Sequence, residues 1–208
     1  MLSPTHLLNS FGALGVLVIL FAETGILLGI VLPGDSLLFT AGLLSATTRR
    51  GDVHLNLPVV LVAAIIGAVV GAQTGYLLGR RFGPRLFRRP DSRLFKQEYV
   101  ERTRVYLEKY GPAKAVVLAR FVPVVRTLMN PLAGVAEIDA RVFTVANIVG
   151  GVLWGAGVTI AGYFLGKSIP NVDRYLLPII AVVVALSLVP VVLEVRKARV
   201  EKRSRPVQ

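Results

Sequence analysis

The chain has 208 residues, of which 54% are hydrophobic, and it contains no cysteine. Its mean hydropathy is +0.66, and several apolar runs reach the roughly 20 residues that a helix needs to cross a bilayer. These values exclude an ordinary soluble protein and predict one polytopic, all-α membrane domain. The net charge of +12 is concentrated from Arg80 to Lys114 and after Arg196, beside apolar segments. Such basic clusters predict contact with anionic lipid headgroups and argue against nucleic acid as a partner.

The first apolar stretch, residues 11–46, predicts a re-entrant hairpin. It is interrupted by Glu23 and by the tripeptide Pro33-Gly34-Asp35. The stretch is too long for one span and too short for two spans with a turn, and Pro-Gly marks a turn. We therefore expect two half-helices with a hinge at Pro33 and Gly34. Irregular backbone at that depth must be buried in protein or line a wet cavity.

The segments that follow alternate between apolar and basic character. The first of them is a clean apolar span rich in small residues, which permit close helix packing. The sequence then predicts a basic surface segment, a second broken and charged apolar stretch, two further spans and a basic tail. In chain order these segments are residues 58–79, 80–110, 112–137, 142–166, 175–195 and 196–208.

The distribution of positive charge predicts that residues 112–137 re-enter rather than cross the membrane. Cytoplasmic segments carry an excess of lysine and arginine. If residues 80–110 are cytoplasmic and the next stretch crossed, the basic tail would lie outside. A stretch that enters and returns keeps the tail, and with it the C-terminus, in the cytoplasm.

An internal match supports this topology. The pentapeptide Gly75-Tyr-Leu-Leu-Gly79 is matched by Gly162-Tyr-Phe-Leu-Gly166, and each ends a span that follows a broken, charged segment. Because the two units begin on opposite sides of the membrane, they predict inverted repeats. Secondary transporters of this plan place their sites near the midplane, where broken helices meet. The last span, 175–195, is additional to the repeats.

Four ionisable residues form the candidate site: Glu23 and Asp35 in the first broken stretch, and Arg120 and Arg126 in the second. We expect each carboxylate to offset a guanidinium, and arginine offers a planar fork of donors suited to phosphate. A carboxylate in a partly dry site takes up a proton more readily, as proton coupling requires. Two alternatives remain open. The four charges could only hold the hairpins together, or the arginines could extend to the membrane interface.

Several neighbours could contribute to such a site. Gln73, Tyr76 and Asn130 could line a cavity, although hydrogen bonds between helices would explain the first two equally well. Asn130 could instead satisfy backbone groups freed by Pro131. We expect Pro123 and Pro131 to break the second stretch as Pro33 breaks the first. Trp154 is interpreted as a packing residue or an interface anchor.

At these residues the chain resembles the DedA family of bacterial membrane proteins, which share the VTT (SNARE-associated) domain with eukaryotic lipid scramblases. The resemblance covers roughly residues 11–170. Two positions depart from the common pattern: Asp35 stands where many members have glutamate, and Val124 where many have glycine. The residues that carry the resemblance are Glu23, Pro33-Gly34-Asp35, Gly75-Tyr76, Gly79-Arg80, Arg120 through Arg126, and Ala133-Gly134.

The resemblance implies a proton-motive-force-dependent carrier of anionic lipid phosphate in the bacterial cytoplasmic membrane. Members are implicated in returning undecaprenyl phosphate across that membrane, and others in moving phospholipid between leaflets. By this likeness, Glu23 and Asp35 would be the proton-sensitive pair and Arg120 and Arg126 the functional arginines. Its partners would then be lipid phosphate, protons and anionic membrane lipids.

Other functions stay open. The chain could be a phospholipid scramblase, a proton-coupled transporter of a small soluble anion, or a membrane scaffold. An enzyme is not expected, because no cysteine is present, His6 and His54 fall outside the spans, and no carboxylates cluster. No metal or cofactor is expected either. The glycine-rich spans permit a homodimer but equally permit packing within one chain.

Overall fold

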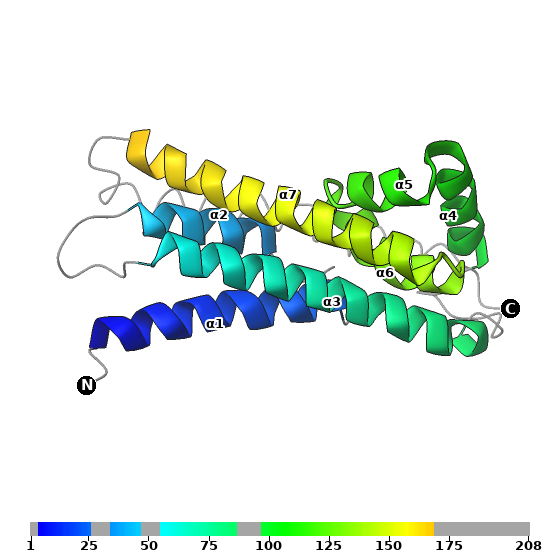
Figure 1. The fold of residues 1–208 in the computed structure, drawn as a ribbon, viewed down its shortest axis with the longest axis horizontal. Coiled ribbons are helices and arrows are strands. Elements are labelled where there is room, and N and C mark those ends of the chain that lie inside the picture. The colour runs from blue at the N-terminus through cyan, green and yellow to red at the C-terminus, as the bar shows by residue number, and fades with distance from the viewer. Residues whose placement is uncertain (1–3, 26–33, 47–54, 87–96, 169–208) are drawn as a thin grey trace, which may run out of the picture.

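The computed structural model describes residues 4–25, 34–46, 55–86 and 97–168, and these ranges contain helices and no strand. The prediction of an all-α chain is confirmed. Pro33, the predicted span 175–195 and the basic tail 196–208 lie outside the described residues. In chain order the helices are α1 (Pro4–Gly25), α2 (Gly34–Ser45), α3 (Leu57–Leu86), α4 (Gln97–Tyr110), α5 (Pro112–Ala119), α6 (Pro123–Val135) and α7 (Ala140–Ser168) (Figure 1).

The two long helices, α3 and α7, run along the length of the described structure. Of the other helices, α1, α2, α5 and α6 lie along them, whereas α4 stands across one end (Figure 1). Within the described chain, Leu57–Gly83 and Ala140–Ser168 are the helices long and apolar enough to cross a membrane. They contain the predicted spans 58–79 and 142–166. The α3 helix continues past its apolar part to Leu86. Arginine is a good helix former, so the basic residues after Gly79 extend the helix.

Both long helices turn large apolar side chains outward. Val62 on α3 and Val145 on α7 are more than half exposed, and valine, leucine and phenylalanine side chains continue the pattern along each helix. Their inward faces carry small residues instead, such as the fully buried Ala64 and Ala72 on α3. A soluble protein rarely exposes such a continuous apolar surface, whereas a helix in lipid requires one.

The shorter helices pack on the two long ones in a reciprocal pattern. The helix α1 packs on α3 while α2 packs on α7, and likewise α5 packs on α7 while α6 packs on α3. The α1–α2 pair lies toward one end of the long helices and the α5–α6 pair toward the other (Figure 1). Exchanging α1, α2 and α3 for α5, α6 and α7 therefore reproduces these four helix contacts.

Glycines allow the two crossings in this pattern to be backbone against backbone. Where α2 crosses α7, and again where α6 crosses α3, one glycine on each helix faces a carbonyl group of the other, and a Cβ there would overlap it. Each glycine lies about one turn after the carbonyl that its partner glycine faces. The contacts are Gly42 with Thr159 and Gly162 with Phe39 in the first crossing, and Gly134 with Tyr76 and Gly79 with Pro131 in the second.

These contacts correct the register of the sequence match. The pentapeptides pair Gly75 with Gly162, but the contacts make Gly79 the counterpart of Gly162. The difference in residue number between Gly79 and Gly162 also separates Gly83 from Gly166 and Gly67 from Gly150. In the last pair, Gly67 faces α1 and Gly150 faces α5. The two alignments differ by one helical turn. Because glycine recurs at every turn of α3, the sequence pattern alone fits either.

The second broken stretch has one break, between Ala119 and Pro123. Val122 is extended, with φ −114° and ψ 109°, as the residue before a proline prefers. Pro123 begins α6, where its missing N–H costs no hydrogen bond. Pro131, expected as a second break, lies inside α6 and the helix continues through it. Arg120 therefore lies at the start of the break, as the C-cap of α5, and Arg126 lies in the first turn of α6.

Candidate functional site

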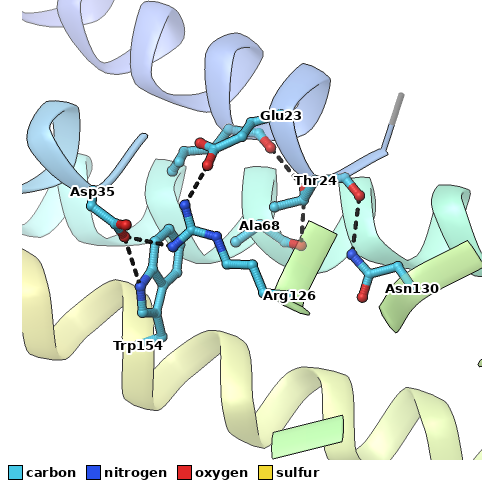
Figure 2. Close-up of polar contacts among 8 residues, drawn as sticks. Glu23, Thr24, Asp35, Ala68, Arg126, Asn130 and Trp154 are labelled. Atoms are coloured by element: carbon cyan, nitrogen blue, oxygen red, sulfur yellow. Dashed lines mark hydrogen bonds and ion pairs between the residues drawn. The ribbon is translucent and has the colours of Figure 1, made fainter. Parts of the chain in front are cut away.

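A buried ion-pair triad joins the two broken stretches. The guanidinium of Arg126 on α6 forks between two carboxylates: Nη1 lies 2.5 Å from Asp35 Oδ1 at the start of α2, and Nη2 donates to Glu23 Oε1 near the end of α1 (Figure 2). The predicted pairing of charges from opposite stretches therefore exists. One arginine receives both carboxylates, which leaves the triad with one excess negative charge.

The three members of the triad differ in their access to solvent. The side chain of Glu23 is completely buried, that of Arg126 nearly so, and that of Asp35 is 37% exposed. Glu23 Oε2 and Arg126 Nε are buried without a hydrogen-bond partner in the described chain. Gly34 lies directly against Glu23 Oε2, where a Cβ would overlap that oxygen. Burying these charges is costly, so the pairing is needed for the fold to hold them.

Trp154 connects the triad to α7. Its indole Nε1 donates to Asp35 Oδ1 at 3.0 Å, and its ring lies under the guanidinium, with Arg126 Cζ 4.4 Å from the ring centroid (Figure 2). A guanidinium over a tryptophan face is a favourable cation–π contact. From sequence Trp154 is interpreted as a packing residue or an interface anchor, whereas the structure brings it into contact with both Asp35 and Arg126. One sequence signal is available. Trp154 follows Asn147, a polar residue within the same apolar span, by two helical turns, so both lie on one face of α7.

Arg120 occupies a separate position. It is almost completely buried, and its Nη2 donates to the carbonyl of Ala68 at 3.3 Å and to Asn147 Oδ1. No carboxylate of the described chain pairs with it, because both predicted carboxylates offset the same guanidinium, that of Arg126. Its aliphatic stem passes over α7 where two glycines leave room, since a Cβ on Gly150 would stand 3.1 Å from Arg120 Cδ.

Asn130 joins the second broken stretch to the end of the first. Its Nδ2 donates to the carbonyl of Thr24 at 3.0 Å (Figure 2). The last carbonyls of a helix lack partners within the helix, and Asn130 satisfies one of them at the end of α1. The Thr24 hydroxyl in turn bonds to Leu20 O at 2.7 Å. Asn130 thus fixes α6 against α1 beside the triad.

The two remaining predicted cavity residues join α3 to other parts of the chain, Gln73 to α7 and Tyr76 to the turn between α6 and α7. Gln73 Oε1 accepts from Thr144 Oγ1 at 3.3 Å and from Asn147 Nδ2 at 3.4 Å, joining α3 to α7. The hydroxyl of Tyr76 donates to the Ile138 carbonyl at 2.6 Å, and the tyrosine side chain is completely buried. Gln73 therefore contacts Asn147, which in turn accepts from Arg120. Tyr76 is a packing residue whose ring stacks on Phe143.

Comparison with known proteins identifies the family. The model of the VTT domain matches residues 32–164, from the start of α2 to near the end of α7. The chain belongs to the DedA family. It is 41% identical to Protein DedA of Escherichia coli K12 over 178 residues, covering 85% of this chain and 78% of that protein. The match includes Asp35, both arginines and Trp154, whereas Glu23 precedes it.

Two mycobacterial relatives are also close. An uncharacterized membrane protein of Mycobacterium tuberculosis H37Rv is 43% identical over 212 residues, covering 99% of this chain and 90% of that protein. One from Mycobacterium leprae is 46% identical over 174 residues, covering 84% and 75%. No solved structure matches the chain. With the outward apolar faces of α3 and α7, these relatives establish a membrane protein of the DedA family.

Proposed function

We propose that this protein is a lipid transporter, driven by the proton motive force, that carries undecaprenyl phosphate across the bacterial cytoplasmic membrane, and that it is not an enzyme. The observation that carries the proposal is the triad, in which both Nη groups of one buried arginine are occupied by carboxylates. Intramembrane charges are costly and mark transport pathways more often than they stabilise a fold.

In this mechanism carboxylate and phosphate compete for the same donors. A guanidinium binds the two oxygens of a phosphate in the same forked geometry in which it binds a carboxylate. Protonation of Glu23 or Asp35 removes one negative charge from the triad and releases one Nη group of Arg126. A lipid phosphate then takes that position. Deprotonation on the other side of the membrane restores the ion pair and expels the phosphate.

The apolar surface beside the arginines favours a lipid over a soluble anion. Leu118, Phe121 and Val122 flank Arg120 in the chain, and each is about half exposed, with Phe121 at 57%. These side chains surround the break between α5 and α6. A lipid tail running along them stays in the hydrocarbon while its headgroup reaches the arginines. A small soluble anion would gain nothing from this surface.

The reciprocal helix packing supports alternating access. We interpret α1–α2 and α5–α6 as re-entrant hairpins of inverted repeats, each followed by a spanning helix, with residues 175–195 as a last span. Two equivalent backbone crossings give the bundle two related arrangements between which it can rock. The exposed basic residues Arg81, Arg104 and Lys114 belong to the end that we assign to the cytoplasm, with anionic lipids as neighbours.

Reconstitution tests this function. Purified protein in liposomes with a pH gradient is given polyprenyl phosphate, and its appearance in the opposite leaflet is followed. We expect the double variant Arg120→Ala, Arg126→Ala to lose transport, while Arg104→Ala, which removes an exposed arginine on α4, retains it. Arg126→Lys keeps the charge but cannot serve both carboxylates. Its transport should fall by at least about tenfold, the effect of losing one charge-assisted hydrogen bond of roughly 1.5–3 kcal/mol.

Three results would overturn the proposal. Unchanged lipid transport in the double arginine variant would remove the arginines from the mechanism. Preferential uptake of water-soluble anions by the same liposomes would indicate a small-anion transporter. Release of inorganic phosphate from the lipid would indicate an enzyme.

A further inference from the structure

We infer that Trp154 is a positioning residue that holds Asp35 on Arg126, and that Glu23 is therefore the group that takes up the proton. The inference rests on the proposed proton coupling and deepens it, since either acid satisfies the mechanism above. It also gives α7 a direct connection to the charged site.

The two carboxylates differ in the donors that surround them. Asp35 Oδ1 accepts from Arg126 Nη1 and from the indole N–H of Trp154, and a third of its side chain reaches solvent. Within the described chain, Glu23 accepts only from Arg126 Nη2, and its second oxygen is buried with no partner there. Donors and water both stabilise an ionised carboxylate. Asp35 has more of each, so Glu23 is the acid that neutralises first.

Trp154 connects α7 to the two carboxylates and the arginine of the triad. The charged groups around it are Glu23 of α1, Asp35 of α2 and Arg126 of α6, with Arg120 as the next cation. Along the same stretch, α3 and α7 contribute no charged side chain. The indole contributes one polar bond to Asp35 and one face to Arg126. Removing the N–H while keeping the ring should therefore weaken the hold on Asp35 and leave the cation–π contact in place.

Proton uptake at Glu23 then has a defined consequence. Neutral Glu23 releases Arg126 Nη2, while Nη1 stays on Asp35 and the guanidinium stays over the indole. Only the Nη2 side of the fork becomes available to a phosphate. The retained half keeps the arginine oriented, so the phosphate meets a donor already in position rather than a free side chain.

The fluorescence of Trp154 reports this step directly, because it is the only tryptophan in the chain. The full-length protein in detergent or nanodiscs is titrated between acid and alkaline pH without substrate. We expect one transition in emission, since neutralising Glu23 changes the position of the guanidinium over the ring. Glu23→Gln should abolish the transition. Asp35→Asn should change the emission at every pH but retain the transition. Glu108→Gln, on the exposed face of α4, should match wild type.

The opposite pattern overturns the inference. A transition that persists in Glu23→Gln, or one that disappears in Asp35→Asn, would assign the proton to another group. A wild-type protein without any transition would show that no protonation changes the surroundings of Trp154. For transport we expect Trp154→Phe to shift the pH profile, because Asp35 then loses the indole donor and holds Arg126 less firmly. A uniform loss at all pH values would reduce Trp154 to a packing residue. Because the titration needs no substrate, its outcome is independent of whether polyprenyl phosphate is transported.

Discussion

Removing the cation of the triad should destabilise the protein strongly and in a manner that depends on Glu23. Arg126→Met keeps an unbranched side chain but leaves the two carboxylates of the triad without a cation. Breaking a buried ion pair by removing one partner costs about 3–5 kcal/mol. The completely buried Glu23 belongs in that range. Asp35 is 37% exposed, so water solvates its charge when the arginine is removed. Asp35 therefore adds at most about 1 kcal/mol to the destabilisation.

The double variant Glu23→Gln, Arg126→Met shows whether the unpaired charge of Glu23 causes the loss of stability. Glu23→Gln alone should be milder than Arg126→Met, because Arg126 then still pairs with Asp35 and no buried charge is left without a counter-ion. In the Arg126→Met background the same change removes the orphaned charge and should recover stability. We expect a coupling free energy near the upper end of the roughly 0.5–3 kcal/mol found for contacting residues. Lowering the pH should also reduce the cost of Arg126→Met, because protonated Glu23 needs no cation.

The measurement is denaturant unfolding of purified protein in detergent, followed by the helical circular dichroism signal. The matched control is the pair Glu101→Gln and Arg104→Met, whose side chains are exposed on α4. Exposed charges of this kind are worth about 0–1 kcal/mol and their cycle should be additive. If the Glu23–Arg126 cycle were additive too, the triad would not be the structural ion pair described above.

Three further substitutions test the packing around the site. Gly162→Ala inserts a Cβ into a backbone carbonyl of α2 and should lower the unfolding free energy by about 1–3 kcal/mol, whereas Gly157→Ala, which points into open space, should leave it unchanged or raise it. Gly34→Ala would overlap the buried glutamate of the triad and should cost a similar amount, measured in the same unfolding assay. Asn147→Leu removes an acceptor of Arg120 and should slow lipid transport with little change in substrate affinity, which a concentration series would show.

The sequence predicts the site because intramembrane charge is costly. Glu23, Asp35, Arg120 and Arg126 are conspicuous in apolar stretches for that reason, and each is buried or partly buried in the fold. The break at Pro123 follows equally directly, because proline excludes a helical conformation from the residue before it. Pro131 shows the limit of that rule, since α6 continues through it.

Partner choice and register do not follow from sequence. Nothing in the pattern of charges assigns both acids to Arg126 and leaves Arg120 on Asn147, because that depends on where α6 begins relative to α2. Residues on neighbouring turns, such as Gly75 and Gly79, are interchangeable in a sequence match, and only the contact with Pro131 distinguishes them. The contact of Trp154 with the triad does not follow from sequence either, because a tryptophan in a span usually packs or anchors at the interface, and its bond to Asp35 joins residues far apart in the chain.

The charges of the site also constrain the energetics of the proposed transport. Two carboxylates and two guanidiniums sum to zero, although Arg120 is not paired with either acid. One proton taken up at Glu23 therefore leaves a single positive charge, which a singly ionised phosphate monoester neutralises. Such esters carry about 1.5–2 negative charges at pH 7, so the singly charged form is present for binding. A carrier loaded with one proton and that form crosses the membrane without net charge. Lipid transport should then follow the pH gradient and ignore a membrane potential imposed by a potassium gradient with valinomycin; a rate that tracked the potential would mean that the loaded site carries charge.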